Sequence, residues 1–369
     1  MYRILCCLLM VLLLMACSKK EDGNSLSYPP VAVYGFPEST QTAVVTKTLI
    51  SPQLAVGTTQ NLTDAFGFDW GSMQKIYDHA IISWYLFTPN GPFIFKDPIF
   101  AQETTLLEGY CDLGEVFVRD PICTPNEVIG AYDQYDAATD THLLTFGLQA
   151  YGEACERLTQ PGYFLVDTMA KDGYLLALLG KQDIGYQYKL LKINLATQTV
   201  EGTLNLLDQA PLFMKQGDQL YAFDPYTVKV FDFDSFALLS SQPNPIALLQ
   251  SLQGFLDPPL ANGQILLDEP AAQPSPYLSY PLLLDLDTGE TLKGGGAYTA
   301  ELATQLGQVE GYAYPHLGAY AVDVERGWVV FGFTTEYHKR GVVYTNFNAE
   351  ILDIVELEVI PNMIFIERE

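Results

Sequence analysis

The chain has 369 residues and carries 44 acidic against 19 basic side chains, which gives a net charge of −25. This balance excludes a nucleic-acid-binding protein, because phosphate contacts need clustered Lys and Arg, and it disfavours adhesion to anionic lipid. Hydrophobic residues make up 49% of the sequence, and there are 23 Tyr, 20 Phe, 29 Gly and 22 Pro. Aromatic strands separated by turn residues are typical of an all-β protein, which is therefore the fold class that we expect.

The first residues have the layout of an export signal. Arg3 precedes an apolar run over residues 4–15, which is too short to span a bilayer comfortably, and Ala16 stands directly before Cys17. The ending Leu-Met-Ala-Cys resembles the lipobox of bacterial lipoproteins. The resemblance implies a signal peptide over residues 1–16, cleavage after it, and a lipid on Cys17. An ordinary signal peptide cut elsewhere, or a short membrane anchor, is the alternative.

Residues 17–30 form a polar stretch without helix or strand periodicity, as expected of a flexible tether. Lys20, Glu21 and Asp22 resemble the lysine-plus-two-acids signal that directs lipoproteins of Bacteroidetes to the outer face of the outer membrane. The resemblance implies a bacterial outer membrane lipoprotein that is exposed at the cell surface. No other apolar stretch approaches about 18 residues, so we expect the membrane to hold the body through lipid alone.

The body shows a loose internal repeat, in which two apolar strands lead to an Asp- or Asn-rich turn and a further strand. Asp and Asn favour such turns because their side chains accept hydrogen bonds from backbone amides two residues further on. Six units can be recognised, at residues 81–95, 128–146, 173–200, 219–235, 263–291 and 328–350. A single hairpin cannot bury both of its faces, whereas blades stacked in a ring can do so.

This strand rhythm resembles that of β-propellers, and the resemblance implies one propeller domain over residues 31–369, with six blades for the six units. Two β-sandwich domains are the alternative, because no signature motif fixes the blade type. Residues 101–127 and 295–318 interrupt the rhythm, and we expect them to be long loops, with a short helix over residues 299–306. Long loops on a rigid scaffold often carry function.

Three cysteines remain in the body, and an exported protein matures in an oxidising compartment where disulfides form. Three cysteines allow one internal disulfide. Cys111 with Cys123 is the favoured pair, because Gly114 and Pro121 between them suggest a chain that folds back on itself. Cys123 with Cys155 is the alternative pair.

The sequence contains no histidine pair spaced for zinc, no Gly-x-Ser-x-Gly elbow and no phosphate-binding glycine loop. Asp285 and Asp287 lie on one face of an expected strand and together could hold calcium, although turn capping is the simpler role. Aromatic rings stack on sugars, so Trp84, Tyr312 and Tyr314 are candidate ligand-binding residues. Packing between blades is the alternative role for these rings.

These observations favour a lipid-anchored propeller of the cell envelope that binds a protein or glycan ligand and performs no chemistry. A calcium-dependent hydrolase or a polysaccharide-processing enzyme is the alternative, and the excess of acidic residues motivates it. A glycosidase needs two carboxylates at a defined separation, which a sequence with 44 acids cannot reveal.

Overall fold

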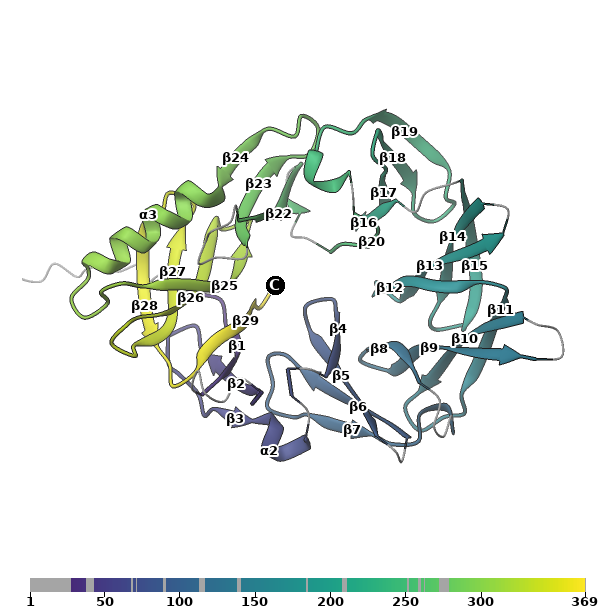
Figure 1. The fold of residues 1–369 in the computed structure, drawn as a ribbon, viewed down its shortest axis with the longest axis horizontal. Helices are drawn as coiled ribbons and strands as arrows, with labels where there is room; N and C mark the ends of the chain where they lie inside the picture. Colours follow the sequence, from purple (N-terminus) through teal and green to yellow (C-terminus); the bar gives the residue numbers. More distant parts are fainter. Residues whose placement is uncertain are drawn as a thin grey trace, which may run out of the picture.

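In the computed structural model, seven sheets surround a central axis, so the fold is a β-propeller (Figure 1). The structure describes residues 28–37, 43–67, 69–70, 72–88, 91–112, 117–137, 141–183, 185–207, 211–250, 252–257, 260–261, 263–271 and 279–368. The predicted signal peptide, Cys17 and the tether up to residue 27 lie outside the described residues. No helix in these ranges is long and apolar enough to cross a membrane.

Blade A is built from both ends of the chain. Its strands, from the axis outward, are β29 (Ile360–Ile366), β1 (Val31–Phe36), β2 (Thr46–Ile50) and β3 (Gln60–Asn61), and a short helix, α2 (Leu62–Phe66), follows. Strand β29 pairs antiparallel with β1, and Val31 lies opposite Ile366. This pairing closes the ring, because the last strand of the chain completes the sheet that the first strands begin.

Blades B, C and D have four strands each. Blade B contains β4 (Met73–Tyr77), β5 (Ile81–Thr88), β6 (Gly91–Pro98) and β7 (Thr105–Leu107). A 3₁₀ turn, η1 (Tyr110–Asp112), leads to blade C, with β8 (Arg119–Cys123), β9 (Glu127–Asp136), β10 (Thr141–Ala150) and β11 (Glu156–Pro161). Blade D contains β12 (Phe164–Lys171), β13 (Tyr174–Asp183), β14 (Gly185–Asn194) and β15 (Thr199–Leu207). In each blade the chain starts near the axis and ends at the rim (Figure 1).

Blades E, F and G complete the ring. Blade E contains β16 (Leu212–Gln216), β17 (Gln219–Phe223), β18 (Thr227–Asp232) and β19 (Leu238–Pro243), and after the turn η2 (Ala247–Leu249) a fifth strand, β20 (Gly254–Phe255), pairs parallel with β16. Blade F contains β21 (Leu260–Ala261), β22 (Gln264–Pro270), β23 (Ser279–Asp285) and β24 (Thr291–Gly294). Helix α3 (Gly295–Gln308) precedes blade G, which contains β25 (His316–Asp323), β26 (Trp328–Thr334), β27 (Arg340–Asn346) and β28 (Ile351–Glu356).

The predicted number of six blades is wrong, because the ring has seven. The six repeat units recognised in the sequence correspond to blades B to G. Blade A has no contiguous unit, since its inner strand comes from residues 360–366 and its other strands from residues 31–61. The closed ring also excludes the alternative of two β-sandwich domains.

The core lies between the blades. Alternate residues of each strand point to opposite faces of the blade and contribute apolar side chains to the core on both sides. In β13, Leu175 and Leu179 pack with blade C, whereas Leu176 and Leu178 between them pack with blade E. Successive side chains point to opposite faces of a strand, so a continuous apolar run serves two neighbouring blades. All four leucines are at most 1% exposed, and each stabilises the ring by about 1.5–3 kcal/mol.

The predicted helix near residues 299–306 is present as α3, which is longer than expected and packs against blades F and G. Tyr298, Leu302 and Leu306 form its buried face, because residues four apart lie on the same side of a helix. The prediction of a long loop over residues 101–127 is wrong, since this segment contains β7, η1 and β8. These elements are only three to five residues long, too short to show a strand or helix period.

The disulfide joins Cys111 to Cys155, whose Cα atoms are 5.1 Å apart, so neither of the two pairs suggested by the sequence is formed. Strand β8 carries Cys123 into the core between blades B and C as a free thiol. There its amide donates to Ser83 Oγ at 2.6 Å, and burial raises the pKa of the thiol to about 12. Cys155 instead directly precedes the rim strand β11, beside η1.

Candidate functional site

Trp84 is completely buried between blades A and B, which corrects its prediction as a ligand-binding residue. Its indole Nε1 donates to Asp97 Oδ2 at 3.3 Å, and the Tyr34 hydroxyl donates to the same oxygen at 2.8 Å. The ring fills the contact between two blades while its polar atom joins a buried network, so neither ring face is open to a sugar.

The two tyrosines predicted with Trp84 differ in exposure. Tyr312 is 9% exposed, and its hydroxyl donates to Glu356 Oε1 at 2.7 Å. Lys339 Nζ lies 4.4 Å from the centre of the Tyr312 ring and donates to the same carboxylate oxygen at 2.6 Å. Tyr314 is 67% exposed and remains a prediction as a ligand-binding residue. The Tyr312 side chain, in contrast, is already in contact with Glu356 and Lys339.

Asp285 caps a turn in the structure. Its Oδ1 accepts hydrogen bonds from the amides of Asp287 and Thr288, at 3.1 and 2.8 Å, and from the Thr288 hydroxyl at 2.8 Å. These bonds lower the pKa of Asp285, with the Thr288 amide as the main cause. Within the described part of the chain, no group of three or more His, Cys, Asp or Glu side chains is arranged to hold a metal ion. Asp285 and Asp287 belong to no such group, and their role as calcium ligands stays a prediction.

A cluster of charged residues at the axis was missed by the sequence reading. Lys75 Nζ of β4 lies 2.7 Å from Asp167 Oδ1 of β12 and 3.8 Å from Asp120 Oδ2 of β8. Both acids occur at irregularities in strand register, which re-aim side chains. Burial raises the pKa of Asp120, against the pull of the Lys75 ammonium. Asp167 Oδ2 also accepts from the Phe255 amide at 2.8 Å, so the cluster ties blades B, C, D and E together.

A second charged group lies where β4, β12 and β20 end. Lys171 Nζ is 2.6 Å from Asp257 Oδ1, and His79 Nε2 is 3.5 Å from Asp257 Oδ2. Burial disfavours the charge of Asp257, but the nearby His79 imidazole and the Lys171 ammonium outweigh it and hold the pKa of Asp257 well below its usual range. Every carboxylate in the two groups has a basic partner, which is the arrangement of a structural ion-pair network. No motif could have revealed it, because the partners come from different blades.

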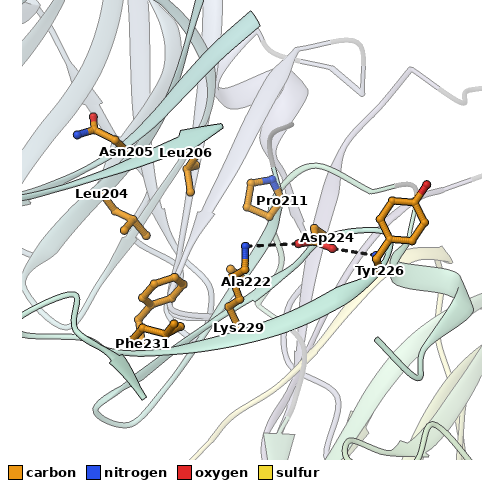
Figure 2. Close-up of a pocket in the computed structure, with 10 residues that line it drawn as sticks. Leu204, Asn205, Leu206, Pro211, Ala222, Asp224, Tyr226, Lys229 and Phe231 are labelled. Atoms are coloured by element: carbon orange, nitrogen blue, oxygen red, sulfur yellow. Dashed lines mark hydrogen bonds and ion pairs between the residues drawn. The ribbon is translucent and has the colours of Figure 1, made fainter. Parts of the chain in front are cut away.

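A largely apolar groove lies between blades D and E, with a volume of about 490 Å³ (Figure 2). We call it the D/E groove. The rim strand β15 contributes Leu204 and Leu206 to one side, and β18 contributes Phe231 and Lys229 to the other. Leu238 of β19 also lines it, so the groove lies between the outer strands of the two blades.

One end of the D/E groove is formed by a turn whose conformation follows from the local sequence. Asp224 Oδ1 accepts from the amides of Tyr226 and Thr227 at 2.8 and 2.6 Å, which is the usual asparagine-or-aspartate turn. Burial opposes the charge of Asp224, but these bonds and the Thr227 hydroxyl hold its pKa below the ordinary value. The carboxylate is 3.7 Å from Lys229 Nζ. The turn leaves the Tyr226 ring 78% exposed at the mouth of the groove.

Exposed apolar side chains continue from the D/E groove onto the rim. Leu238 and Leu239 are 56% and 54% exposed, and every residue of β19 is exposed. Both β15 and β19 are end strands of their sheets, so each has a free backbone edge. Apolar surface that continues from a groove onto a strand edge is typical of a site where another protein chain docks.

No protein family matches this sequence, and no curated protein matches it. Several solved structures resemble the fold. The β-propeller domain of the Trilobed protease from Pyrococcus furiosus is 11% identical, covering 89% of this chain and 97% of that one, with a TM-score of 0.46. A protein of unknown function from Bacteroides caccae is 12% identical, covering 93% and 100%, with a TM-score of 0.35. BamB from Moraxella catarrhalis is 12% identical, covering 83% and 82%, with a TM-score of 0.34. At this identity the likenesses concern the fold and carry no activity over to this chain.

Proposed function

We propose that this protein is a lipid-anchored propeller of the bacterial cell envelope that binds a protein partner in the D/E groove. The partner contributes an extended segment whose apolar side chains enter between Leu206 and Phe231. Its backbone pairs with the free edge of β15 or β19. The body itself serves as a rigid platform, and the lipid at Cys17 keeps that platform at the outer membrane.

The observation that carries this proposal is the coincidence of an apolar groove with two unpaired strand edges. Tyr226, Leu238 and Leu239 are each more than half exposed around the groove, which costs free energy in water unless a partner covers them. Strand addition uses main-chain hydrogen bonds for affinity and side-chain pockets for specificity. The groove follows the six-residue strand β18, so about 20 Å of an extended chain would fit along it.

The envelope location is supported by the disulfide between Cys111 and Cys155, because disulfides persist in oxidising compartments and are rare in the cytosol. Replacing Cys17 by Ser tests the anchor. We expect a fatty-acid probe fed to the producing cells to label the native chain, and the Cys17→Ser chain to be unlabelled and released from the membrane fraction. Labelling that persists in the variant would refute the lipid anchor.

Site-specific photo-crosslinking in producing cells tests the docking site. A photoreactive phenylalanine analogue replaces Leu238 in one variant and Tyr337 in the control variant. Tyr337 is 67% exposed on blade G, away from the groove. We expect a discrete cross-linked species from position 238 and none from position 337. The substitution Leu206→Asp in the same chain should abolish that species, because a charge in the groove is costly to desolvate.

Two outcomes of the cross-linking would contradict the proposal. Equal adducts from both positions would indicate non-specific capture, and the absence of any adduct from position 238 would mean that the groove has no partner in the envelope.

A further inference from the structure

A second cavity lies between blades B and C, with a volume of about 460 Å³. We call it the B/C cavity. Leu107 from β7 and Val128 from β9 supply apolar lining, and the ring of Tyr151 stands at the end of β10. Glu103 and Glu108, on either side of β7, also line it. This volume is within the range of about 300–1,000 Å³ that small organic ligands occupy.

The wall of the B/C cavity formed by Tyr110 is fixed before any ligand arrives. The Tyr110 hydroxyl is within hydrogen-bond distance of the carbonyl oxygens of Gly147, at 2.7 Å, and Gly130, at 3.2 Å. The next residue, Cys111, is tied to blade C by the disulfide, and its amide donates to Gln149 Oε1 at 2.8 Å. A preformed wall lowers the ordering cost of binding, which favours a small ligand.

The charged groups of the B/C cavity that lack a partner are carboxylates. Lys96 Nζ donates to the Pro125 carbonyl oxygen at 2.9 Å and lies 4.6 Å from the centre of the Tyr151 ring, while burial lowers the pKa of Lys96. The Tyr151 hydroxyl donates to the Thr124 carbonyl oxygen at 2.8 Å. Glu103 and Glu108 are exposed, and neither has an ion-pair or hydrogen-bond partner through its side chain among the described residues.

We propose that the B/C cavity binds a small organic cation, with an apolar or aromatic body against Leu107, Val128 and Tyr151 and a protonated amine at the carboxylate of Glu103 or of Glu108. Ionised carboxylates only accept hydrogen bonds, so they select a donor such as an ammonium group. The net charge of −25 favours the approach of cations and opposes that of anions. None of the large hydrophobic residues that are exposed in the described chain lines this cavity, which distinguishes it from the D/E groove as a small-molecule site.

Three probes that share a phenylethyl or phenylmethyl body test this proposal by titration calorimetry with the purified mature chain. They are 2-phenylethylammonium, neutral 2-phenylethanol and anionic phenylacetate. We expect the ammonium probe to bind saturably, the alcohol to bind more weakly and the acid to show no binding. The double variant Glu103→Gln/Glu108→Gln should weaken the ammonium probe about tenfold or more, since each charge-assisted hydrogen bond contributes that order of discrimination.

The matched control is the double variant Glu290→Gln/Glu325→Gln, which removes the same charge from exposed positions in blades F and G. We expect it to bind the ammonium probe as the native chain does. Equal losses in the two double variants would overturn the proposal, because they would show a general charge effect. So would phenylacetate binding as tightly as the ammonium probe, or an ammonium probe that does not bind at all.

Discussion

Asp97 is the carboxylate on which four side chains converge in the contact between blades A and B. Lys47 Nζ donates to it at 2.7 Å, the Tyr34 hydroxyl at 2.8 Å, the Thr104 hydroxyl at 3.0 Å and the Trp84 indole at 3.3 Å. The side chains of Lys47 and Asp97 are both 0% exposed. Burial lowers the pKa of Lys47, and the charge of Asp97 opposes that shift. The two buried charges are therefore tolerated because Lys47 and Asp97 form an ion pair with each other.

Removing one partner of the Lys47–Asp97 pair should destabilise the protein much more than removing both partners. We expect Asp97→Ala to lower the free energy of unfolding by about 3–5 kcal/mol, because Lys47 is left as an uncompensated buried charge. The double variant Lys47→Met/Asp97→Leu should recover a large part of that loss. Urea unfolding of the native chain, the two single variants and the double variant measures the coupling, and additive losses would contradict it.

Glu127 should make stability depend on pH. The residue is 7% exposed, and burial raises the pKa of its carboxyl to about 7 from an ordinary value of 4.5. The folded chain therefore holds a proton that the unfolded chain has lost, so stability falls as the pH rises from 4.5 towards 7 and stays low above that.

The variant Glu127→Gln cannot lose that proton. We expect it to exceed the native chain in the free energy of unfolding by about 1–3 kcal/mol at pH 8, with the advantage shrinking towards pH 4.5. Thermal melts of both chains at the two pH values check this. An advantage of the same size at both would show that ionisation is not its cause.

Closure of the ring, at the scale of elements, depends on the close approach of β1 and β29. At Gly35, where the register of this pair shifts, an added Cβ would lie 2.3 Å from the Ile360 carbonyl oxygen. Only glycine allows the two backbones to come this near. The contact is also the place where the two ends of the chain meet, so its loss would open blade A.

We expect Gly35→Ala to destabilise the protein by about 1–3 kcal/mol, because the strands must separate to admit the methyl group. Amide exchange should quicken in β29 and β1 before other strands. Gly318→Ala is the matched control, since its added Cβ would be 3.8 Å from the Pro361 carbonyl oxygen, an ordinary contact near the same strand. Equal effects of the two substitutions would argue against this account of closure.

The disulfide stabilises the protein by linking two elements that are distant in the sequence. Cys111 and Cys155 are 44 residues apart, so their link restricts the unfolded chain by about 4 kcal/mol in the loop-entropy model. We expect Cys111→Ser/Cys155→Ser to lose about 2–4 kcal/mol in urea unfolding, and a reducing agent to bring the native chain to the same level. A native chain whose unfolding is unchanged by reduction would show that the link contributes little.

At the scale of the whole molecule, the sequence was sufficient to locate each blade that is formed by one continuous stretch of chain. It was not sufficient to locate blade A, which is formed by two separate stretches. The apolar strand rhythm located blades B to G, because each is one stretch of chain. Blade A was missed because its hydrogen bonds join residues more than 300 positions apart, such as Val31 and Ile366. The disulfide was mispaired for a related reason: the position of Cys155 beside η1 depends on how blade C folds.

The D/E groove and the B/C cavity could not be predicted from the sequence, because each lies between two blades. Leu204 and Phe231 belong to different blades and look like ordinary strand residues, so nothing marks them as the two sides of the D/E groove. The role of Trp84 was mispredicted because the sequence pattern around an aromatic residue within a strand is the same whether its ring packs inward or faces solvent. Burial is decided by the neighbouring blade, here by Tyr34 and Asp97.

The most direct test of the D/E groove compares hydrogen exchange of the purified mature chain with that of the same chain in outer membrane vesicles from the producing cells. Exchange reports every blade at once, and amides that a partner covers exchange more slowly. We expect slower exchange in the vesicles at β15, β18 and β19, with blades A and G unchanged. Identical exchange in both samples, or protection confined to another blade, would contradict the D/E groove as the docking site.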